Sequence, residues 1–370
     1  MTDTLERAAL RDVTRSVLAD LATEQQVREH MDGDGFDRAL WAAMAQVGLL
    51  GLAVPEELGG SGAGWTEQSV VHEELGRTLA CVPFLATATL AAAALSASTD
   101  EARSRWLPGL AAGTTIVTVA APAAGSGSWY DPPSGVSAES SGPAWRLAGR
   151  LRYVLDAAVA DLFLVTADAG GTVGLFAVER ADVASVEPVA TSDRTRRVGH
   201  VVLHDSPAVM VGGPEAVLAA HGVGVTMLAA EQTGGAAACL ERSVDHVRTR
   251  VQFGRPIGSF QAVQHHCANM LLRVESARSA ARRAAQELDD PPGPDADPGV
   301  VSRLIAGSVC TEAYLACAST NVQLHGGTGF TWEHSAQLHV KRSRGSAVLL
   351  GQPAEHRRAL RASGKVLVGL

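Results

Sequence analysis

The spacing of apolar residues predicts that the first part of the chain is helical. Phe36, Leu40 and Met44 recur four residues apart, which places their side chains on one face of a helix. A loop rich in proline and glycine interrupts the pattern at 54–62, and helical composition resumes after it. We therefore expect an N-terminal helical domain over residues 1–113.

The pattern then changes to short runs of β-branched and aromatic residues that are separated by Gly, Pro, Ser and Asp. The clearest runs are 115–119, 162–166, 173–178 and 200–203. Short strands with turn signals between them predict a compact β domain at 114–212.

Helical patterning returns and continues to the end of the chain. Four long segments are expected, at 222–250, 258–289, 299–325 and 334–363. Long helices joined by short breaks predict an antiparallel four-helix bundle over 213–370. The order helical, β, helical is an α+β architecture. It does not support a dinucleotide-binding βαβ fold, because no G-x-G-x-x-G follows a strand.

Composition narrows the function classes. The chain has 370 residues, of which 46% are hydrophobic, enough for more than one buried core. A net charge of -8 without a block of like charges argues against nucleic acid as a partner. The five cysteines form no C-x-x-C pair and suit neither zinc nor a disulfide framework. No signal peptide and no bilayer-spanning run are recognised, so we expect a cytoplasmic protein with no membrane partner.

The most informative stretch runs from Arg250 to Gln261. Its Gly-x-Pro would end one helix and start the next, which places Arg250 in the last turn of the first helix. Arg can hold a phosphate bidentately, while Gln252, Phe253 and Gln261 could pack against and hydrogen-bond an aromatic ring system. The alternative is an ordinary helix hairpin in which Arg250 is only a cation at a helix C-terminus.

A second stretch, from Gln323 to Thr331, contains Gly326, Gly327 and Gly329. Three glycines in four positions let the backbone approach a ligand closely and present its N–H groups. Taken alone, the stretch could equally be a flexible turn.

Together with the segment from Trp41 to Gly60, these two stretches resemble the three signatures of the acyl-CoA dehydrogenase family, in order and at family spacing. The resemblance covers nearly the whole chain. It implies α,β-dehydrogenation of an acyl-CoA thioester in lipid metabolism, an FAD held between subunits, tetramers assembled through the C-terminal bundle, and an electron-accepting flavoprotein as partner.

The resemblance also assigns residues. In the family, the Arg-x-x-Phe-Gly turn and the Gln-x-x-Gly-Gly turn of one subunit bind the FAD of its neighbour. These turns match Arg250, Phe253, Gln323 and Gly327 here. We therefore expect the cofactor-binding residues of the C-terminal region to be Arg250, Gln252, Phe253, Gln261, Gln323, Gly326 and Gly327.

The β domain departs from the family pattern. The family's Thr-Glu-Pro…Gly-Ser-Asp segment keeps its Pro, its Gly and Ser126 here, but the Thr, Glu and Asp are lost. The flavin-facing Trp-Ile-Thr-Asn segment begins with Tyr153, which can replace Trp as a stacking surface. Leu155 has lost the hydroxyl that would hydrogen-bond the flavin. We expect Ser126 and Tyr153 to contact this subunit's own cofactor, in a pocket less polar than the family's.

The sequence departs further from the family pattern at the catalytic base. The family removes a proton from the carbon α to the thioester while the flavin takes a hydride from the β carbon. A carboxylate desolvated in the acyl pocket suits this role, because burial raises its pKa. In most members a Glu follows the Gly-Gly turn, and that position is Leu350 here. In a second branch the Glu lies near the start of the first bundle helix, where gapless counting places Gly224.

Glu231 is the nearest substitute. It follows Gly224 by two helical turns, so both residues lie on one face of the predicted helix, and its neighbours are small. Glu231 is therefore the candidate base. The alternatives are a buried Glu hydrogen-bonded to an adjacent bundle helix, and an exposed charge. The remaining polar candidates favour structural or surface roles: His325, Glu333, His265, His266 and Asp245.

Several functions remain compatible with this sequence. The chain could be a complete dehydrogenase with an unusual base, working as a homo-oligomer. It could instead form a heterotetramer with a homologous chain that supplies the base. Such mixed tetramers occur in the family, chiefly among enzymes that act on bulky acyl groups such as steroid side chains. The rivals are a flavin-dependent monooxygenase or oxidase on the same fold, and a non-catalytic structural subunit.

Overall fold

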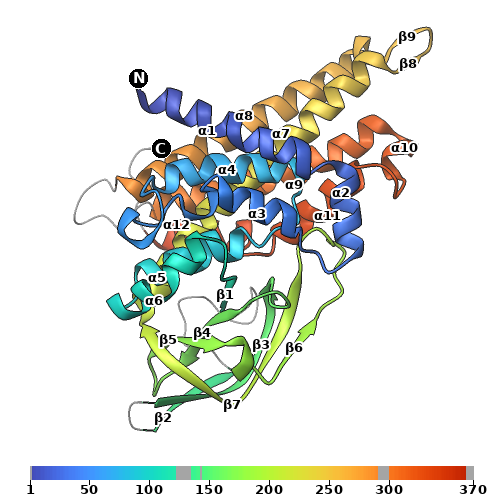
Figure 1. Ribbon diagram of the computed structural model, residues 1–370. Coiled ribbons are helices and arrows are strands. Elements are labelled where there is room, and N and C mark those ends of the chain that lie inside the picture. Colours follow the sequence, from blue (N-terminus) through green and yellow to red (C-terminus); the bar gives the residue numbers. More distant parts are fainter. Residues whose placement is uncertain (1, 122–134, 142–143, 291–299, 364–370) are drawn as a thin grey trace. The chain divides into compact units, whose positions relative to one another are not determined.

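The computed structural model describes residues 2–121, 135–141, 144–290 and 300–363 (Figure 1). The fold is α+β, with helices at both ends of the sequence and a β domain between them. By its internal contacts the chain divides into two compact units. The first comprises Met1–Arg28, Ser69–Ala80 and Val225–Leu370, and the second comprises Glu29–Gln68 and Cys81–Gly224.

The N-terminal region is helical, as its pattern predicts. Its helices are α1 (Thr2–Leu21), α2 (Glu24–Asp32), α3 (Arg38–Gln46), α4 (Trp65–Thr78), the π-helical turn η3 (Leu85–Ala91), α5 (Ala92–Ser96) and α6 (Asp100–Ala111). Phe36, Leu40 and Met44 are buried, which confirms the predicted apolar face. Asp37 starts α3, because its carboxylate accepts a hydrogen bond from the N–H of Leu40.

The middle region is a seven-stranded sheet. Its strands are β1 (Val117–Ala120), β2 (Val136–Ser141), β3 (Ala144–Leu155), β4 (Leu162–Asp168), β5 (Val173–Glu179), β6 (Ser185–Pro188) and β7 (Val198–Gly212). In the part of the sheet that the structure describes, β1–β4 and β2–β4 are parallel and the other pairs are antiparallel. Because β4 pairs with both β2 and β5, the strands β4, β2, β3, β7 and β5 close into a ring. Among the described residues, the one helical turn between these strands is η4 (Arg180–Asp182), so no crossover helix is seen there.

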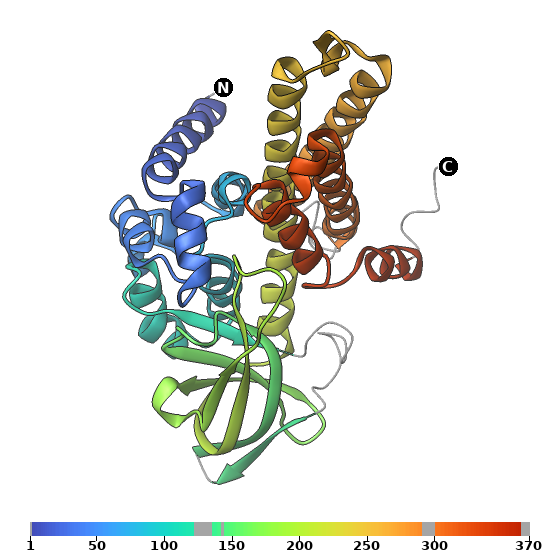
Figure 2. The ribbon, with the colours of Figure 1, turned by 90° about the vertical axis from the view of Figure 1, so that its right-hand side faces the viewer.

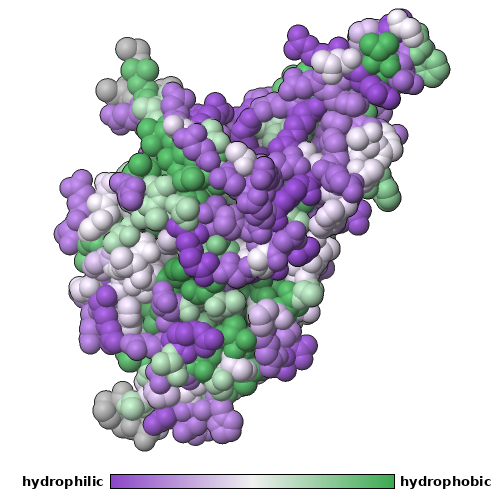
Figure 3. Space-filling model, turned by 45° about the vertical axis from the view of Figure 1, so that its right-hand side comes forward, coloured by the Kyte–Doolittle hydropathy of each residue, from purple (hydrophilic) through white to green (hydrophobic). Residues whose placement is uncertain are grey.

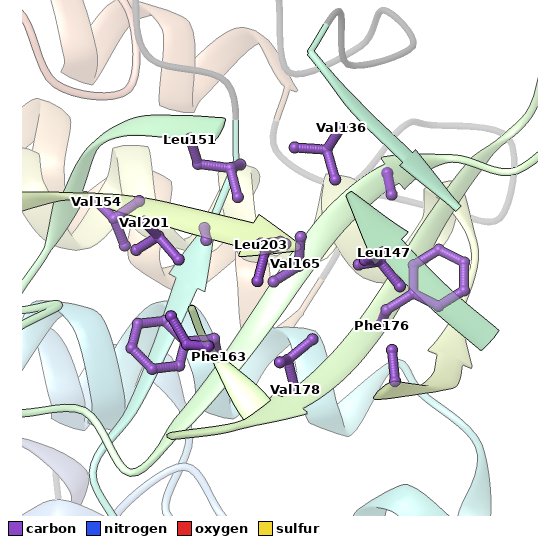
Figure 4. Close-up of a cluster of buried hydrophobic side chains, with 14 of the residues drawn as sticks. Val136, Leu147, Leu151, Val154, Phe163, Val165, Phe176, Val178, Val201 and Leu203 are labelled. Carbon is purple, nitrogen blue, oxygen red and sulfur yellow. The ribbon is translucent and has the colours of Figure 1, made fainter. Parts of the chain in front are cut away.

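Alternating side chains of these strands fill the interior of the β domain (Figure 4). Phe163, Val165, Phe176, Val178 and Val201 are almost completely buried there. They alternate with residues of the opposite face, and in β4 and β5 those residues are buried as well. The β domain therefore has a core of its own.

The C-terminal region is a helical bundle (Figures 1 and 2). Its helices are α7 (Pro214–Thr249), α8 (Gln261–Asp289), α9 (Val300–His325), the short α10 (Gly327–Phe330), α11 (Ala336–Ser346) and α12 (Pro353–Ala362). A small hairpin of β8 (Val251–Gln252) and β9 (Arg255–Pro256), followed by η5 (Ile257–Ser259), joins α7 to α8. The first three predicted helices are confirmed, whereas the fourth is two helices that are separated at 347–352.

Apolar length alone does not make α9 a membrane helix. By length and composition, α9 could cross a bilayer, and it is the one such helix among the described residues. However, 50% of its most apolar window is buried. This burial is typical of a core helix packed against its neighbours in a bundle.

Candidate functional site

The segment from Arg250 to Gln261, which we call the arm tip, lies where α7 ends and α8 begins. Phe253 is 90% exposed and has a φ of +53°, a left-handed conformation that only a specific local turn imposes on a non-glycine residue. In Figure 3 hydrophobic atoms gather at the end of the arm formed by α7 and α8, although most of that arm is hydrophilic. Val251, in the same segment, is 54% exposed, so the arm tip has an exposed apolar patch of the kind that can serve as a binding surface.

The arm tip also presents polar groups outward. Arg250, Gln252 and Gln261 are exposed, and among the described residues Arg250 takes part in no ion pair. The backbone holds Arg250 in place, because its N–H donates to the carbonyl of His246 at 2.8 Å and its carbonyl accepts from Ile257 at 2.8 Å. A positioned guanidinium beside an exposed aromatic ring can bind an anion attached to a flat ring system.

The segment from Gln323 to Phe330, which we call the glycine turn, lies at the C-terminal end of α9. Gln323, Gly326 and Gly327 are exposed, and Gly326 has a φ of +63°. A methyl group added to Gly326 or Gly327 would meet no atom within 4 Å, so the backbone is open on that side. A hydrogen bond from α11 stabilises the turn: the side-chain amide of Gln337 donates to the carbonyl of Gly329 at 2.9 Å.

Of the two cofactor-binding candidates in the β domain, Tyr153 lies within the described residues. Tyr153 is 51% exposed, has a φ of +57° and lies edge-on to His200, with ring centroids 5.2 Å apart. An exposed tyrosine held in a left-handed conformation on β3 is available as a stacking surface. Ser126 lies outside the described residues.

Glu231, the candidate base, is buried within α7 and pairs with an arginine. Its carboxylate oxygen lies 3.1 Å from Nε of Arg342 on α11, and both side chains are only 6% exposed. This ion pair matches the structural alternative for Glu231, a buried carboxylate bound to an adjacent bundle helix. A guanidinium at this distance favours the ionised carboxylate and so makes it a weaker base than a free desolvated one.

The small residues around Glu231 have a packing role in the structure. A Cβ on Gly234 would lie 1.8 Å from the carbonyl oxygen of Glu73, and one on Gly76 would lie 1.9 Å from the carbonyl oxygen of Glu231. The backbones of α4 and α7 therefore touch at these glycines. Gly235 makes room in the same way for the ring of Tyr314 on α9. These glycines are explained by close helix packing, without an acyl chain beside them.

The two family positions for the base contain no carboxylate. Leu350 is buried and has a φ of +54°, so the left-handed turn is present with an apolar side chain. Gly224 is buried inside α7. The other polar candidates lie at the surface or bind the backbone. Glu333, His265, His266 and Asp245 are exposed, and His325 hydrogen-bonds the carbonyl of Asn321 at 2.8 Å.

The structure adds a set of buried polar pairs between the bundle helices that sequence patterns do not reveal. They join α7 to α9 or α9 to α11 and are Gln232–Thr311 at 2.9 Å, Ser243–Asn321 at 2.9 Å and Tyr314–His339 at 2.9 Å. Burial lowers the pKa of His339 well below its ordinary value. A neutral imidazole in the core fits this arrangement, because its Nδ1 bonds the tyrosine hydroxyl.

The chain is similar to known proteins over most of its length. The family model for the acyl-CoA dehydrogenase C-terminal domain matches residues 212–364, and that for the N-terminal domain matches residues 4–114. The acyl-CoA dehydrogenase IpdE2 of Mycolicibacterium smegmatis is 34% identical over 96% of this chain and 98% of its own length.

Two solved structures are similar over nearly their whole length. A variant of the Tcur3481-Tcur3483 steroid ACAD has a TM-score of 0.89 and 32% identity, and covers 98% of this chain and 99% of its own. The ChsE4-ChsE5 complex from Mycobacterium tuberculosis has a TM-score of 0.87 and 30% identity, with 97% of each chain covered. With both terminal family models matched and the fold shared, the chain belongs to the acyl-CoA dehydrogenase family.

Proposed function

We propose that this chain is one subunit of a mixed FAD-dependent acyl-CoA dehydrogenase, in which a homologous second chain supplies the catalytic base. The reaction is the α,β-dehydrogenation of an acyl-CoA thioester. The observation that carries the proposal is that this chain has no free carboxylate at the positions where the base is expected. Leu350 and Gly224 occupy the two family base positions, and Glu231 is already paired with Arg342.

The arm tip and the glycine turn support a role in holding FAD. Arg250 is exposed without an ion-pair partner among the described residues, Phe253 presents a bare ring, and the backbone at Gly326 and Gly327 is open. A flavin dinucleotide requires these groups, namely a cation for the pyrophosphate, an apolar surface for a ring and backbone N–H groups free of side chains. The residues present therefore fit the cofactor that the family implies.

Each of these groups would have a distinct task. When bound, FAD supplies the acceptor for the hydride. Arg250 would fix the pyrophosphate, and Phe253 would cover a ring face and exclude water. Gln323 and the open backbone at Gly327 would orient the dinucleotide. The proton at the α carbon would leave to a carboxylate of the second chain.

Similar proteins support a mixed assembly. Two structures that resemble this chain carry the names of two chains each, and one is described as a steroid ACAD. We infer by analogy that the substrate here is the CoA thioester of a bulky acyl group, and that electrons leave to an electron-accepting flavoprotein. The fold alone does not select among acyl groups, since the shape of the pocket decides that choice.

The test compares the chain alone with the chain co-expressed with a homologous acyl-CoA dehydrogenase. We expect flavin and dye-linked dehydrogenation only in the co-expressed assembly. Arg250→Ala should lower flavin affinity by about 10- to 150-fold, as expected for the loss of a charge-assisted hydrogen bond of roughly 1.5–3 kcal/mol. Arg273→Ala, another exposed arginine of α8, is the matched control and should retain flavin.

Two results would overturn the proposal. One is full dehydrogenase turnover by the chain alone, which would show that it supplies its own base. The other is unchanged flavin content in the Arg250→Ala assembly, which would remove the arm tip from the cofactor site. A yellow chain that consumes oxygen instead of desaturating a thioester would favour the oxidase or monooxygenase alternative.

A further inference from the structure

Three histidine rings stack in a row inside the C-terminal bundle unit. His246 belongs to α7, His325 ends α9, and His334 lies in the segment between α10 and α11. The ring centroids of His246 and His325 are 4.1 Å apart with an interplanar angle of 31°, and those of His325 and His334 are 4.5 Å apart at 52°. His325 is thus in contact with a ring on each side.

This histidine stack joins the arm tip to the glycine turn. His246 lies one helical turn before Arg250, and its carbonyl accepts the N–H of Arg250 at 2.8 Å. His325 lies two residues after Gln323 and directly before Gly326. Ring contact at His325 therefore connects two segments that are far apart in the sequence and that both present groups for the flavin.

Backbone hydrogen bonds fix the orientation of two of the rings. Nδ1 of His325 donates to the carbonyl of Asn321 at 2.8 Å, and Nδ1 of His334 accepts the N–H of Ala336 at 3.2 Å. The hydrogen-bond pattern places the proton of neutral His325 on Nδ1 and leaves Nδ1 of neutral His334 unprotonated. Both interactions are compatible with neutral rings in contact.

Hydrogen bonds from α2 stabilise the segment that contains His334. The guanidinium of Arg28 donates to the carbonyls of Trp332 at 3.2 Å and Glu333 at 2.9 Å, and it pairs with Glu24 at 2.8 Å. Contacts from α2 thus fix the residues that directly follow the glycine turn.

We propose that His325 is a positioning residue that couples the arm tip to the glycine turn, and that the coupling weakens when the flanking rings of His246 and His334 become protonated. The proposal rests on the proposed role of both segments in holding FAD. It adds a requirement that the family signatures do not state, namely that the two segments hold the cofactor well only while they are fixed to each other.

The charges around the histidine stack decide the direction of the pH effect. Burial, and next the neighbouring His325, lower the pKa of both His246 and His334. Arg250 also lowers the pKa of His246, and Arg242 and Arg28 that of His334, whereas Glu24 raises the latter. Below neutral pH, protonation of His246 or His334 therefore places a positive charge against the ring of His325 and close to these arginines, and the stack is expected to separate.

The experiment measures the dissociation constant of FAD for the co-expressed assembly, by flavin fluorescence, between pH 8 and pH 5.5. We expect affinity to fall by at least about tenfold across this range. His325→Ala should lose about tenfold already at pH 7.5, because the ring contacts are gone. His325→Phe keeps an aromatic ring between His246 and His334, so it should bind near normally at pH 7.5. His265→Phe is the matched control on an exposed surface.

A His325→Ala assembly with unchanged affinity and an unchanged pH profile would overturn the proposal. A second readout separates this failure from failure of the proposed function. The imidazole protons of His246 and His334 can be titrated by NMR in the protein without flavin, and both should titrate at higher pH in His325→Ala. If the unmodified assembly binds no FAD at any pH, the proposed function fails. Unmoved titration curves would then also refute the coupling by His325.

Discussion

The arm tip and the interior around Glu231 belong to one bundle, yet they have opposite properties. The arm tip presents outward an aromatic ring that is 90% exposed and an arginine that takes part in no ion pair among the described residues. In the interior, Glu231 is bound to Arg342, and glycines bring helix backbones into contact. Groups for binding a neighbour's cofactor are thus present at the surface, while the place expected for the chemistry is filled by structural contacts.

The largest effect expected from this difference concerns Arg342. Arg342→Leu would leave the carboxylate of Glu231 buried without its arginine, which destabilises a protein by roughly 3–5 kcal/mol. Replacing both residues, Glu231→Leu with Arg342→Leu, should recover most of that loss, because apolar residues often substitute for a buried ion pair at little cost. The measurement is the free energy of unfolding in urea.

A small effect of Arg342→Leu alone would contradict this account. It would mean that water or another group reaches Glu231 and that the interior is less closed than the ion pair suggests. The contrast between the exposed arm tip and the closed interior would then no longer hold, since Glu231 could be available to a substrate.

A smaller effect concerns His339 and pH. Because burial keeps the folded-state pKa of His339 well below the ordinary value, the unfolded chain binds a proton that the folded chain does not. The stability from this group is present above about pH 6.5 and is lost as the pH falls below that value. His339→Phe should therefore reduce the pH slope of the unfolding free energy by up to about 1.4 kcal/mol per unit.

The check is a set of urea titrations between pH 7.5 and pH 5.5. His266→Phe, at an exposed position of α8, is the control and should keep the slope of the unmodified protein. An identical slope in His339→Phe would show that His339 does not remain neutral in the folded state.

The smallest effect on stability is expected at Phe253. Its ring is 90% exposed, so Phe253→Ser should change the free energy of unfolding by no more than about 0.5 kcal/mol. Flavin affinity of the mixed assembly should nevertheless fall by about 2- to 12-fold, as for an aromatic contact of roughly 0.5–1.5 kcal/mol. Comparing the two measurements on one variant separates a binding surface from a packing surface. A clear loss of stability would assign Phe253 to the fold instead.

Sequence patterns predicted the parts of the fold that depend on local periodicity. The apolar face around Leu40 and the three long bundle helices follow from spacing alone. The strand β3 is absent from the sequence prediction, although Arg146, Arg150 and Arg152 at exposed positions alternate with the buried Leu147 and Leu151, which is the period-two pattern of a strand. The break at 347–352 was also missed, although Gly351 and Pro353 are a stop signal in the sequence.

The site was predictable only where its chemistry is local. The arm tip and the glycine turn were found as short motifs, since each is continuous in sequence. Arg342 lies 111 residues from Glu231, and no spacing rule connects them. The histidine stack likewise combines His246 with two residues that follow much later, so ring contact is decided by tertiary packing.

The central claim is that this chain helps to hold the flavin while a second chain supplies the base. The most direct test is the turnover of the mixed assembly carrying Glu231→Leu with Arg342→Leu, normalised to bound flavin, because this pair of changes removes the carboxylate without leaving a buried charge. We predict turnover within about threefold of the unmodified assembly. A loss of about 10²–10⁴-fold, the size expected for removing a general base, would place the base in this chain and contradict the account.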